Sequence, residues 1–375
     1  MTGSIVFPDH IARLRPSAPG HPAGAIAQAH ALDPARILQL ASNENPLGPS
    51  PAAMSALAMH APDPSRYPDN DCTSLVDALS QWHGVPADWI VTGAGSESVI
   101  GIAVSALLCP GRRTVFPQYS FQAYANAVQR IGATAVVVPS PQWAVDLDGL
   151  RRALQEPASV VYIANPGNPT GTLLPPDALD AFLRSVPPEV AVVLDEAYHE
   201  YVDASLRGDA VAWVRRHPNL LVTRTFSKAY GLAGLRIGYG IAQPAFADML
   251  RRVRSPFIVS DAAQVAARAA LGDAAFIEQT VRSNTEARAV LAEGLARLGL
   301  RCAPSQGNFV MVEAGDGQAW AQLLQRRGVL VRPLAGYGLR GALRITVGTP
   351  DDCRRVIDTM AAEIAAGRAP APRHA

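Results

Sequence analysis

The chain has 375 residues, of which 49% are hydrophobic and 17% charged, so it is long enough to bury a large core and to form two domains. With 33 Lys and Arg against 32 Asp and Glu, the formal net charge is +1, which argues against a nucleic-acid-binding or anionic-membrane-binding surface. The four cysteines are far apart and form no metal-ligand spacing, and no apolar run resembles a signal peptide or a membrane span. These features predict a soluble cytoplasmic protein that carries no metal site.

The N-terminal 40 residues are predicted to form an arm. Residues 1–40 are rich in Pro, Ala and Gly, with one short helix expected near Ile11–Leu14. A segment of this kind rarely packs on itself, so we expect it to lie across the small domain or a partner subunit. A turn-rich loop follows Leu40, and helical periodicity begins near Pro51 and continues to about Met59.

From residue 73 the pattern alternates between helix and strand. The predicted helices cover 73–83, 99–108, 121–131, 177–185 and 208–216. The predicted strands cover 89–92, 114–116, 134–138, 160–164, 190–194, 220–225 and 237–241. Short continuous apolar strands are typical of a parallel sheet that helices bury on both faces, so this part is predicted to be α/β.

The C-terminal part follows a different pattern. From about 245 the chain is mostly helical, with a long helix expected at 274–298. A smaller α+β unit then contains strands 309–312, 329–332 and 343–347 and helices 318–327 and 350–366. We therefore divide the chain into an arm (1–40), a large domain (41–270) and a small C-terminal domain (271–375).

Polar residues gather where predicted strands end, which is where open α/β sheets bind ligands. Gly93–Glu97 opens a helix and offers free backbone N–H groups to an anion. Asp195 closes a very apolar strand, and Lys228 follows another; a desolvated lysine loses a proton readily and attacks carbonyls. Each feature alone has an ordinary structural explanation, as a tight turn or a strand cap.

Together these residues match what pyridoxal phosphate requires of a protein. Lys228 supplies an amine for a Schiff base, and Asp195 an acidic partner for the pyridinium nitrogen. Tyr198 and Asn168 follow strand ends and could hydrogen-bond the phenolic oxygen of the ring, while Tyr119 could stack on its face. The phosphate would be held by hydroxyl and arginine side chains, namely those of Thr225, Ser227 and Arg236.

These stretches resemble the fold-type-I pyridoxal-phosphate aminotransferases, most closely the histidinol-phosphate aminotransferase family. The matching segments are Leu40–Ser50, Arg66–Pro68, Gly95–Glu97, Asn168–Gly171, Asp195–Tyr198, Thr225–Lys228, Ala233–Arg236, Val331–Pro333 and Leu343–Thr349. The resemblance implies a large domain with a mostly parallel seven-stranded sheet between helices, and a smaller α+β domain. It also implies a homodimer with shared active sites.

The resemblance further assigns roles to individual residues. Lys228 would carry the cofactor and move the proton of the substrate, with Asp195 and Tyr198 as the other catalytic residues. The implied cofactor-binding residues are Gly95, Ser96, Glu97, Tyr119, Asn168, Asp195, Tyr198, Thr225, Ser227, Lys228 and Arg236, with Tyr67 reaching the cofactor of the neighbouring subunit. Ser96 stands where the family usually has an acidic residue. Asn45, Arg332 and Arg344 would contact the substrate.

The implied activity is that of a histidinol-phosphate:2-oxoglutarate aminotransferase of histidine biosynthesis, acting on glutamate, 2-oxoglutarate and a phosphorylated imidazole substrate. Relatives on the same scaffold act on aromatic amino acids or decarboxylate a phosphothreonine, and these alternatives stay open, because a few pocket contacts change preference by only ~1–3 kcal/mol. A pyridoxal-phosphate-binding regulatory module would need a basic DNA-binding segment before Leu40, and the residues there are too few and not basic enough. A dinucleotide-binding dehydrogenase is disfavoured because glycines 231, 234, 238 and 240 do not follow the first strand of a βαβ unit.

Overall fold

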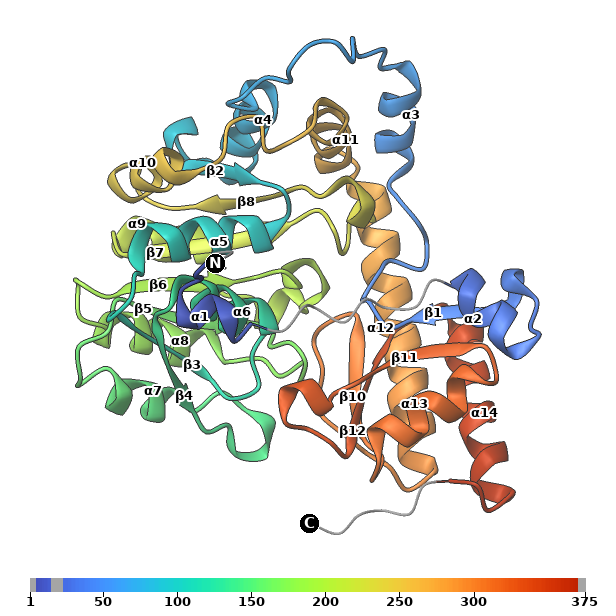
Figure 1. Ribbon diagram of the computed structural model, residues 1–375. Helices are drawn as coiled ribbons and strands as arrows, with labels where there is room; N and C mark the ends of the chain where they lie inside the picture. The colour runs from blue at the N-terminus through green and yellow to red at the C-terminus, as the bar shows by residue number, and fades with distance from the viewer. Residues whose placement is uncertain (1–4, 15–22, 370–375) are drawn as a thin grey trace.

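The computed structural model describes residues 5–14 and 23–369 (Figure 1). The predicted N-terminal arm is thus described in two pieces, and residues 15–22 lie outside the described residues. Its first piece holds α1 (Asp9–Ala12), which contacts α6 (Gln122–Ile131). Its second piece holds α2 (Ala23–His30), a 3₁₀ turn at Pro34–Arg36 and β1 (Leu38–Leu40). The arm therefore contacts both parts of the molecule.

The larger sheet has seven strands in the order β2-β8-β7-β6-β5-β3-β4 (Figure 1). Their bounds are β2 (Ile90–Gly93), β3 (Arg113–Pro117), β4 (Thr134–Val138), β5 (Val160–Ala164), β6 (Ala191–Asp195), β7 (Leu220–Thr225) and β8 (Gly238–Ile241). β8 pairs antiparallel with β2 and β7, and every other pair in this sheet is parallel. The prediction of a mostly parallel seven-stranded sheet is confirmed.

Both faces of this sheet are buried, as the apolar runs predicted. Successive residues of a strand point to opposite faces, so Val161 and Ile163 pack into one hydrophobic cluster and Val160 and Tyr162 into another. The first cluster is completed by α3 (Pro51–Met59), α4 (Thr73–His83), α7 (Leu147–Ala153), α8 (Pro176–Ser185), α9 (Ala210–Arg216) and α11 (Asp261–Leu271). The second is completed by α5 (Ser96–Leu107), α6 and α10 (Pro244–Val253).

The smaller sheet has five strands in the order β1-β11-β12-β10-β9. It consists of β1, β9 (Arg301–Cys302), β10 (Phe309–Glu313), β11 (Val329–Pro333) and β12 (Ala342–Thr346), with α12 (Ala274–Arg297), α13 (Gly317–Gln325) and α14 (Pro350–Ala365) packed on it. Thr349 and Asp352 form a capping box and Pro350 occupies the first helical position, which explains why α14 begins there. The sequence analysis did not predict β9 or α7, because elements of two and seven residues show little periodicity.

The two sheets meet at the carboxyl ends of β6 and β7. Tyr198 and Ala229 from the larger part pack with Phe309 of β10, and the rings of Tyr198 and Phe309 lie 5.1 Å apart.

Within residues 5–14 and 23–369, no helix is both long enough and apolar enough to cross a membrane. The same residues contain no group of three or more His, Cys, Asp or Glu side chains arranged to hold a metal ion.

Candidate active site

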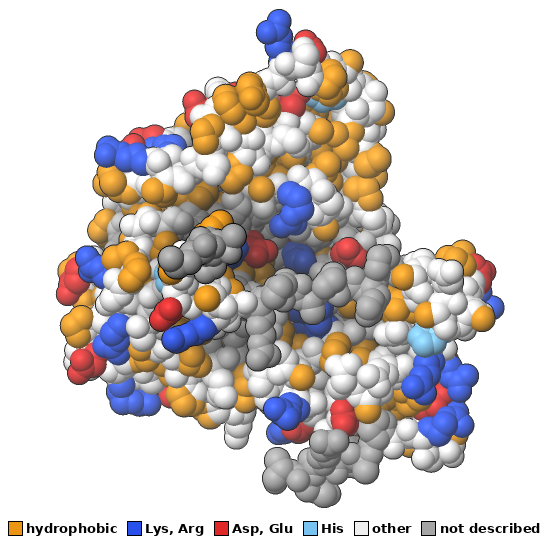
Figure 2. Space-filling model, in the orientation of Figure 1, with side chains coloured by type: hydrophobic (Ala, Val, Ile, Leu, Met, Phe, Trp, Pro, Cys, Tyr) orange, Lys and Arg blue, Asp and Glu red, His pale blue; other side chains and the backbone are white. Residues whose placement is uncertain are grey.

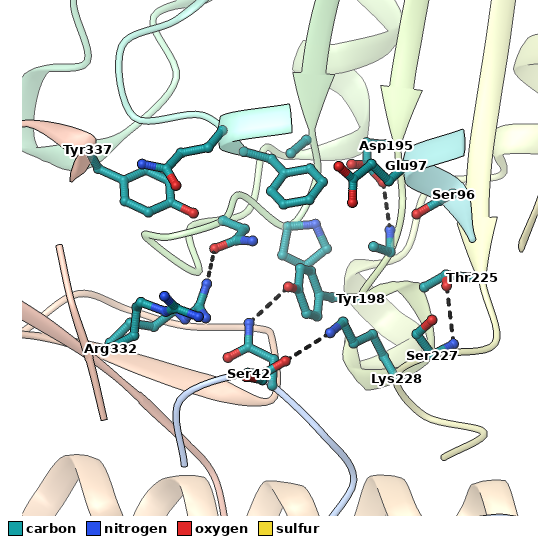
Figure 3. A pocket seen from close by; sticks show the side chains of 18 of the residues that line it. Ser42, Ser96, Glu97, Asp195, Tyr198, Thr225, Ser227, Lys228, Arg332 and Tyr337 are labelled. Carbon is teal, nitrogen blue, oxygen red and sulfur yellow. Dashed lines mark hydrogen bonds between the residues drawn. The ribbon is translucent and has the colours of Figure 1, made fainter. Parts of the chain in front are cut away.

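A cavity of about 430 Å³ lies where the two sheets meet (Figure 3). Residues that follow β5, β6 and β7 line one part of it, together with the N-terminus of α5. Residues from β11, β12 and the loop after β1 line the other part. Figure 2 shows Lys and Arg side chains along the hollow between the two parts of the molecule. Basic groups thus gather at the point where the polar strand ends were expected to form a site.

Lys228 extends into this cavity from the loop after β7 (Figure 3). Its Nζ donates a hydrogen bond to the backbone oxygen of Ser42 at 3.1 Å. Burial, with the nearby charges of Arg344 and Arg236, lowers the pKa of Lys228 from 10.5 to about 8. A larger share of its amine is therefore neutral near pH 7 than for an ordinary lysine, and the neutral form is the one that attacks a carbonyl.

Asp195 is the last residue of β6, and its carboxylate is buried at the wall of the cavity. Its Oδ2 accepts a hydrogen bond from the Tyr124 hydroxyl at 2.8 Å. Its Oδ1 accepts from the Thr223 hydroxyl at 3.3 Å and from the backbone N–H of Ala197 at 3.2 Å. Burial raises the pKa of Asp195, and these three donors oppose that rise. A carboxylate has about four lone-pair sites, so Asp195 retains acceptor capacity toward the cavity.

An anion site lies at the start of α5. Gly95 has φ +83°, which favours glycine, and the missing side chain leaves room for the Arg236 guanidinium, because a Cβ atom built there would lie 2.6 Å from Nη2. Arg236 Nη1 donates to Ser227 Oγ at 3.3 Å, and the N–H of Ser227 donates to Thr225 Oγ1 at 3.1 Å. Backbone N–H groups at a helix N-terminus, hydroxyls and a guanidinium form a set that suits a phosphate group.

Tyr198 and Asn168 lie between the lysine and the arginines. The Tyr198 hydroxyl accepts a hydrogen bond from Asn43 Nδ2 at 2.9 Å, and burial raises its pKa to about 12, so it remains a neutral phenol. Asn168 Oδ1 accepts from Arg344 Nη1 at 2.6 Å. Both side chains line the cavity.

Arg344 and Arg332 stand opposite each other on the antiparallel pair β11 and β12. Arg344 Nη2 donates to the backbone oxygen of Ala41 at 2.8 Å, and its buried Nε has no hydrogen-bond partner. Tyr337 interacts with the Arg344 guanidinium. Within the described parts of the chain, neither arginine forms an ion pair with a carboxylate. This end of the cavity is therefore positively charged and open to an anion.

Most of the predicted site residues line this one cavity. They are Ser96, Glu97, Asn168, Asp195, Tyr198, Thr225, Ser227, Lys228, Arg236, Arg332 and Arg344. Gly95 lies directly behind them, against Arg236. The structure thus brings together residues from positions 95 to 344 that the sequence analysis grouped by their place at strand ends and by resemblance. Their chemical roles stay predictions.

Three predicted residues, Asn45, Tyr119 and Tyr67, do not line this cavity. Asn45 was expected to contact substrate, but its amide donates to the backbone oxygen of Ala229 at 2.9 Å and to Thr280 Oγ1 at 3.2 Å, inside the protein. Asn43, which has a left-handed φ of +56°, lines the cavity in its place. Tyr119 was expected to stack on the cofactor, but Phe121 lines the cavity from the N-cap position of α6, two residues farther along.

Tyr67 is 81% exposed and lies outside the cavity. Its ring stacks on Phe257 with centroids 4.5 Å apart. Its predicted role in a neighbouring subunit concerns a second chain and stays a prediction.

Eight residues that line the cavity were not among the predicted site residues, namely Ser42, Asn43, Phe121, Gln122, Ala164, Pro166, Ala197 and Tyr337. The hydrogen bond from the Tyr124 hydroxyl to Asp195 was not predicted either. Ser42 and Asn43 belong to a loop that the sequence analysis had already singled out, and only its backbone geometry decides which asparagine turns inward. Tyr124 lies on the apolar face of α6, where an aromatic residue is indistinguishable from ordinary core.

The polar groups of the cavity match those of a phosphorylated pyridine aldehyde. The cavity offers an amine with a lowered pKa, a buried carboxylate, a neutral phenol and an anion site whose glycine leaves room beside Arg236. These groups fit the aldehyde, ring nitrogen, phenolic oxygen and phosphate of such a cofactor.

The chain was compared with known proteins. Residues 35–360 match the family described as aminotransferase class I and II. The chain is 49% identical to histidinol-phosphate aminotransferase 1 of Cupriavidus pinatubonensis, over 93% of this chain and 94% of that protein. It is 46% identical to histidinol-phosphate aminotransferase 2 of Ralstonia nicotianae, over 97% and 98%. The histidinol-phosphate aminotransferase of Sinorhizobium meliloti, solved in complex with pyridoxal-5'-phosphate, superposes with a TM-score of 0.86 at 28% identity, covering 97% of this chain and 99% of that one. The chain therefore belongs to the class I and II aminotransferases and, within them, to the histidinol-phosphate aminotransferase family.

Proposed function

We propose that this chain binds pyridoxal phosphate and transfers the amino group of glutamate to a phosphorylated imidazole ketone, as a histidinol-phosphate:2-oxoglutarate aminotransferase. The cavity supports the cofactor through Lys228, Asp195 and the anion site at α5. The relatives support the substrate, since several at 41–49% identity bear this name.

When bound, the cofactor supplies an electron sink for negative charge at the substrate α-carbon. Lys228 Nζ holds the cofactor and then moves the proton at that carbon, because its lowered pKa permits it both to take up and to release a proton near neutral pH. Asp195 would supply a negative charge to pair with the ring nitrogen. Tyr198, as a neutral phenol, can donate a hydrogen bond to the ring oxygen.

The observation that carries the substrate class is the buried Arg344, which has an unpartnered Nε and no counter-ion within the described chain. A buried cation without a counter-ion is costly, and an anionic ligand removes much of that cost. Glutamate brings a carboxylate, and histidinol phosphate brings a phosphate but no carboxylate. The planar guanidiniums of Arg344 and Arg332 can bind both anions in turn.

The test compares L-histidinol phosphate with L-histidinol, which lacks only the phosphate. We expect kcat/KM to fall by about 10²-fold or more without the phosphate, because the loss of a charged partner at a buried site costs about 2–5 kcal/mol. Comparable kcat/KM values for the two compounds would overturn the proposed substrate while leaving the cofactor proposal intact.

We further propose a homodimer in which Tyr67 reaches the active site of the other subunit. Tyr67 and Phe257 form an exposed aromatic pair, and Met54 and Met59 of α3 are exposed as well. Figure 2 shows hydrophobic side chains over this region. Exposed apolar groups in one area are typical of an interaction surface. Sedimentation equilibrium of the purified chain should give twice the chain mass, and an active monomer would contradict the proposal.

A further inference from the structure

Tyr124 contacts Asp195 from α6, in the helix layer that covers one face of the larger sheet. It lies on α6 and is fully buried, with its hydroxyl 2.8 Å from Asp195 Oδ2. Three rings hold the Tyr124 ring in place: Tyr162 stacks on it with centroids 5.0 Å apart, and Phe116 and Phe121 meet it edge-on at 6.4 and 5.9 Å. Its hydroxyl is therefore fixed in position by the packing of a whole aromatic cluster.

The two oxygens of Asp195 are held in different ways. Oδ1 accepts one hydrogen bond from the backbone N–H of Ala197, two residues along the chain. It accepts a second from the hydroxyl of Thr223, which is paired with Asp195 on β7. Oδ2 has one donor within the described chain, the Tyr124 hydroxyl. The carboxylate can pivot about its terminal torsion unless both oxygens are held, since that torsion has a broad energy profile.

We infer that Tyr124 is a positioning residue, which rests on the proposed function: it holds the Asp195 carboxylate in the orientation that meets the ring nitrogen of pyridoxal phosphate. Asp195 lines the cavity and Tyr124 does not, so the Tyr124 hydroxyl contacts the carboxylate from outside the cavity lining. Tyr124 thus acts through Asp195 and not on the cofactor directly.

The protonation states agree with this role. Burial and the neighbouring Asp195 raise the pKa of Tyr124 well above 10, so its hydroxyl keeps its proton and donates it in the hydrogen bond. A hydrogen bond donated to a carboxylate favours the ionised form, and only the ionised form attracts a protonated ring nitrogen. Burial alone raises the pKa of Asp195, so this donor helps to preserve the charge.

Tyr162 provides a matched control. It stacks on Tyr124 and is equally buried, but its hydroxyl has no hydrogen-bond partner within the described chain. Tyr124→Phe and Tyr162→Phe therefore remove the same atom from the same aromatic cluster. Only the first change removes a bond to Asp195.

The experiment measures cofactor affinity in place of turnover. Wild type, Tyr124→Phe and Tyr162→Phe are purified as full chains and stripped of cofactor, and their folding is checked by thermal unfolding. Each is titrated with pyridoxal phosphate and with its 1-deaza analogue, in which carbon replaces the ring nitrogen. We expect Tyr124→Phe to lower the affinity for pyridoxal phosphate by about 10- to 100-fold, the range for a hydrogen bond to a charged group. The affinity of Tyr124→Phe for the deaza analogue should differ from that of wild type by less than ~3-fold. Tyr162→Phe should bind both ligands with affinities within ~3-fold of wild type.

A third variant tests which oxygen matters. Thr223→Val removes one donor from Oδ1 but leaves the Ala197 N–H in place, so we expect a smaller loss, also confined to pyridoxal phosphate. Equal weakening of both ligands by Tyr124→Phe would overturn the inference and make Tyr124 a packing residue. So would unchanged affinity for pyridoxal phosphate. If wild type itself fails to bind pyridoxal phosphate, the proposed function fails instead.

Discussion

The two ends of the cavity are built differently. At the cofactor end, the carboxylate of Asp195 already has three hydrogen-bond donors and Arg236 already contacts Ser227. At the substrate end, Arg344 is equally buried but keeps an unpartnered nitrogen and no counter-ion within the described chain. The polar groups of the first end are thus held largely by one another, whereas the charge of Arg344 is not balanced by a carboxylate of the described chain.

The roles proposed for the two ends account for this difference. A cofactor that stays bound favours a rigid site whose polar groups are held in advance. A transaminase binds its two substrates in turn at one place, so its anion site has to accept a carboxylate and a phosphate. Arg344 donates to two neutral groups, the Ala41 backbone oxygen and the Asn168 side-chain oxygen. Its positive charge is therefore not balanced by them and can attract either a carboxylate or a phosphate.

Lys228→Ala is expected to produce the largest effect. Loss of the amine removes both the covalent attachment and the proton transfer, so kcat should fall by about 10⁴-fold. Single-turnover assays with glutamate would measure it. Lys228→Arg keeps a positive charge but cannot form the Schiff base, so it should lose as much activity. Normal turnover by either variant would show that Lys228 does not carry the cofactor.

Arg344→Ala should impair the reaction with glutamate and leave the affinity for the cofactor almost unchanged. We expect kcat/KM for glutamate to fall by about 10²- to 10³-fold, because one partner of a buried charge pair is removed, while pyridoxal phosphate affinity changes by less than ~3-fold. Arg344→Lys keeps the charge without the planar two-nitrogen contact and should recover only part of the loss. Equal losses for glutamate and cofactor would make Arg344 a structural residue and erase the distinction between the ends.

The lowered pKa of Lys228 predicts the pH dependence of cofactor capture. Below pH 8 the amine is mostly protonated and cannot attack an aldehyde, so the rate should rise about tenfold per pH unit and level off above about pH 8. Stopped-flow absorbance after mixing the stripped protein with pyridoxal phosphate would follow it. A rate that keeps rising to about pH 10.4, as for an exposed lysine, would show that burial does not lower this pKa.

The smallest expected effect concerns the ring that covers the cofactor. Phe121→Ala should lower the affinity for pyridoxal phosphate by about 2- to 12-fold, which corresponds to the loss of an aromatic contact of about 0.5–1.5 kcal/mol. Tyr119→Ala should change it by less than ~2-fold, because Tyr119 does not line the cavity. Fluorescence titration would distinguish the two, and a larger loss of affinity in Tyr119→Ala would support the predicted stacking role of Tyr119 and contradict the one expected here for Phe121.

The cofactor end was largely predictable because strands buried on both faces are apolar and the polar residues after them stand out, as Asp195 and Lys228 do. The arginines were found by resemblance, since nothing in the pattern separates them from strand-surface charges. The choice of Asn43 over Asn45 depends on a backbone angle that one turn-rich loop does not reveal. The bond from Tyr124 to Asp195 joins residues 71 positions apart, and no periodicity records it.

The most direct test of the account is a set of half-reactions. The cofactor-loaded protein is mixed separately with L-histidinol phosphate, L-glutamate and L-phenylalanine, and the decay of the visible absorbance of the lysine-bound cofactor is followed. The account predicts fast conversion by histidinol phosphate and glutamate and slow conversion by phenylalanine. If phenylalanine matched or exceeded histidinol phosphate, the substrate assignment would be wrong, and the protein would be an aromatic aminotransferase on the same scaffold.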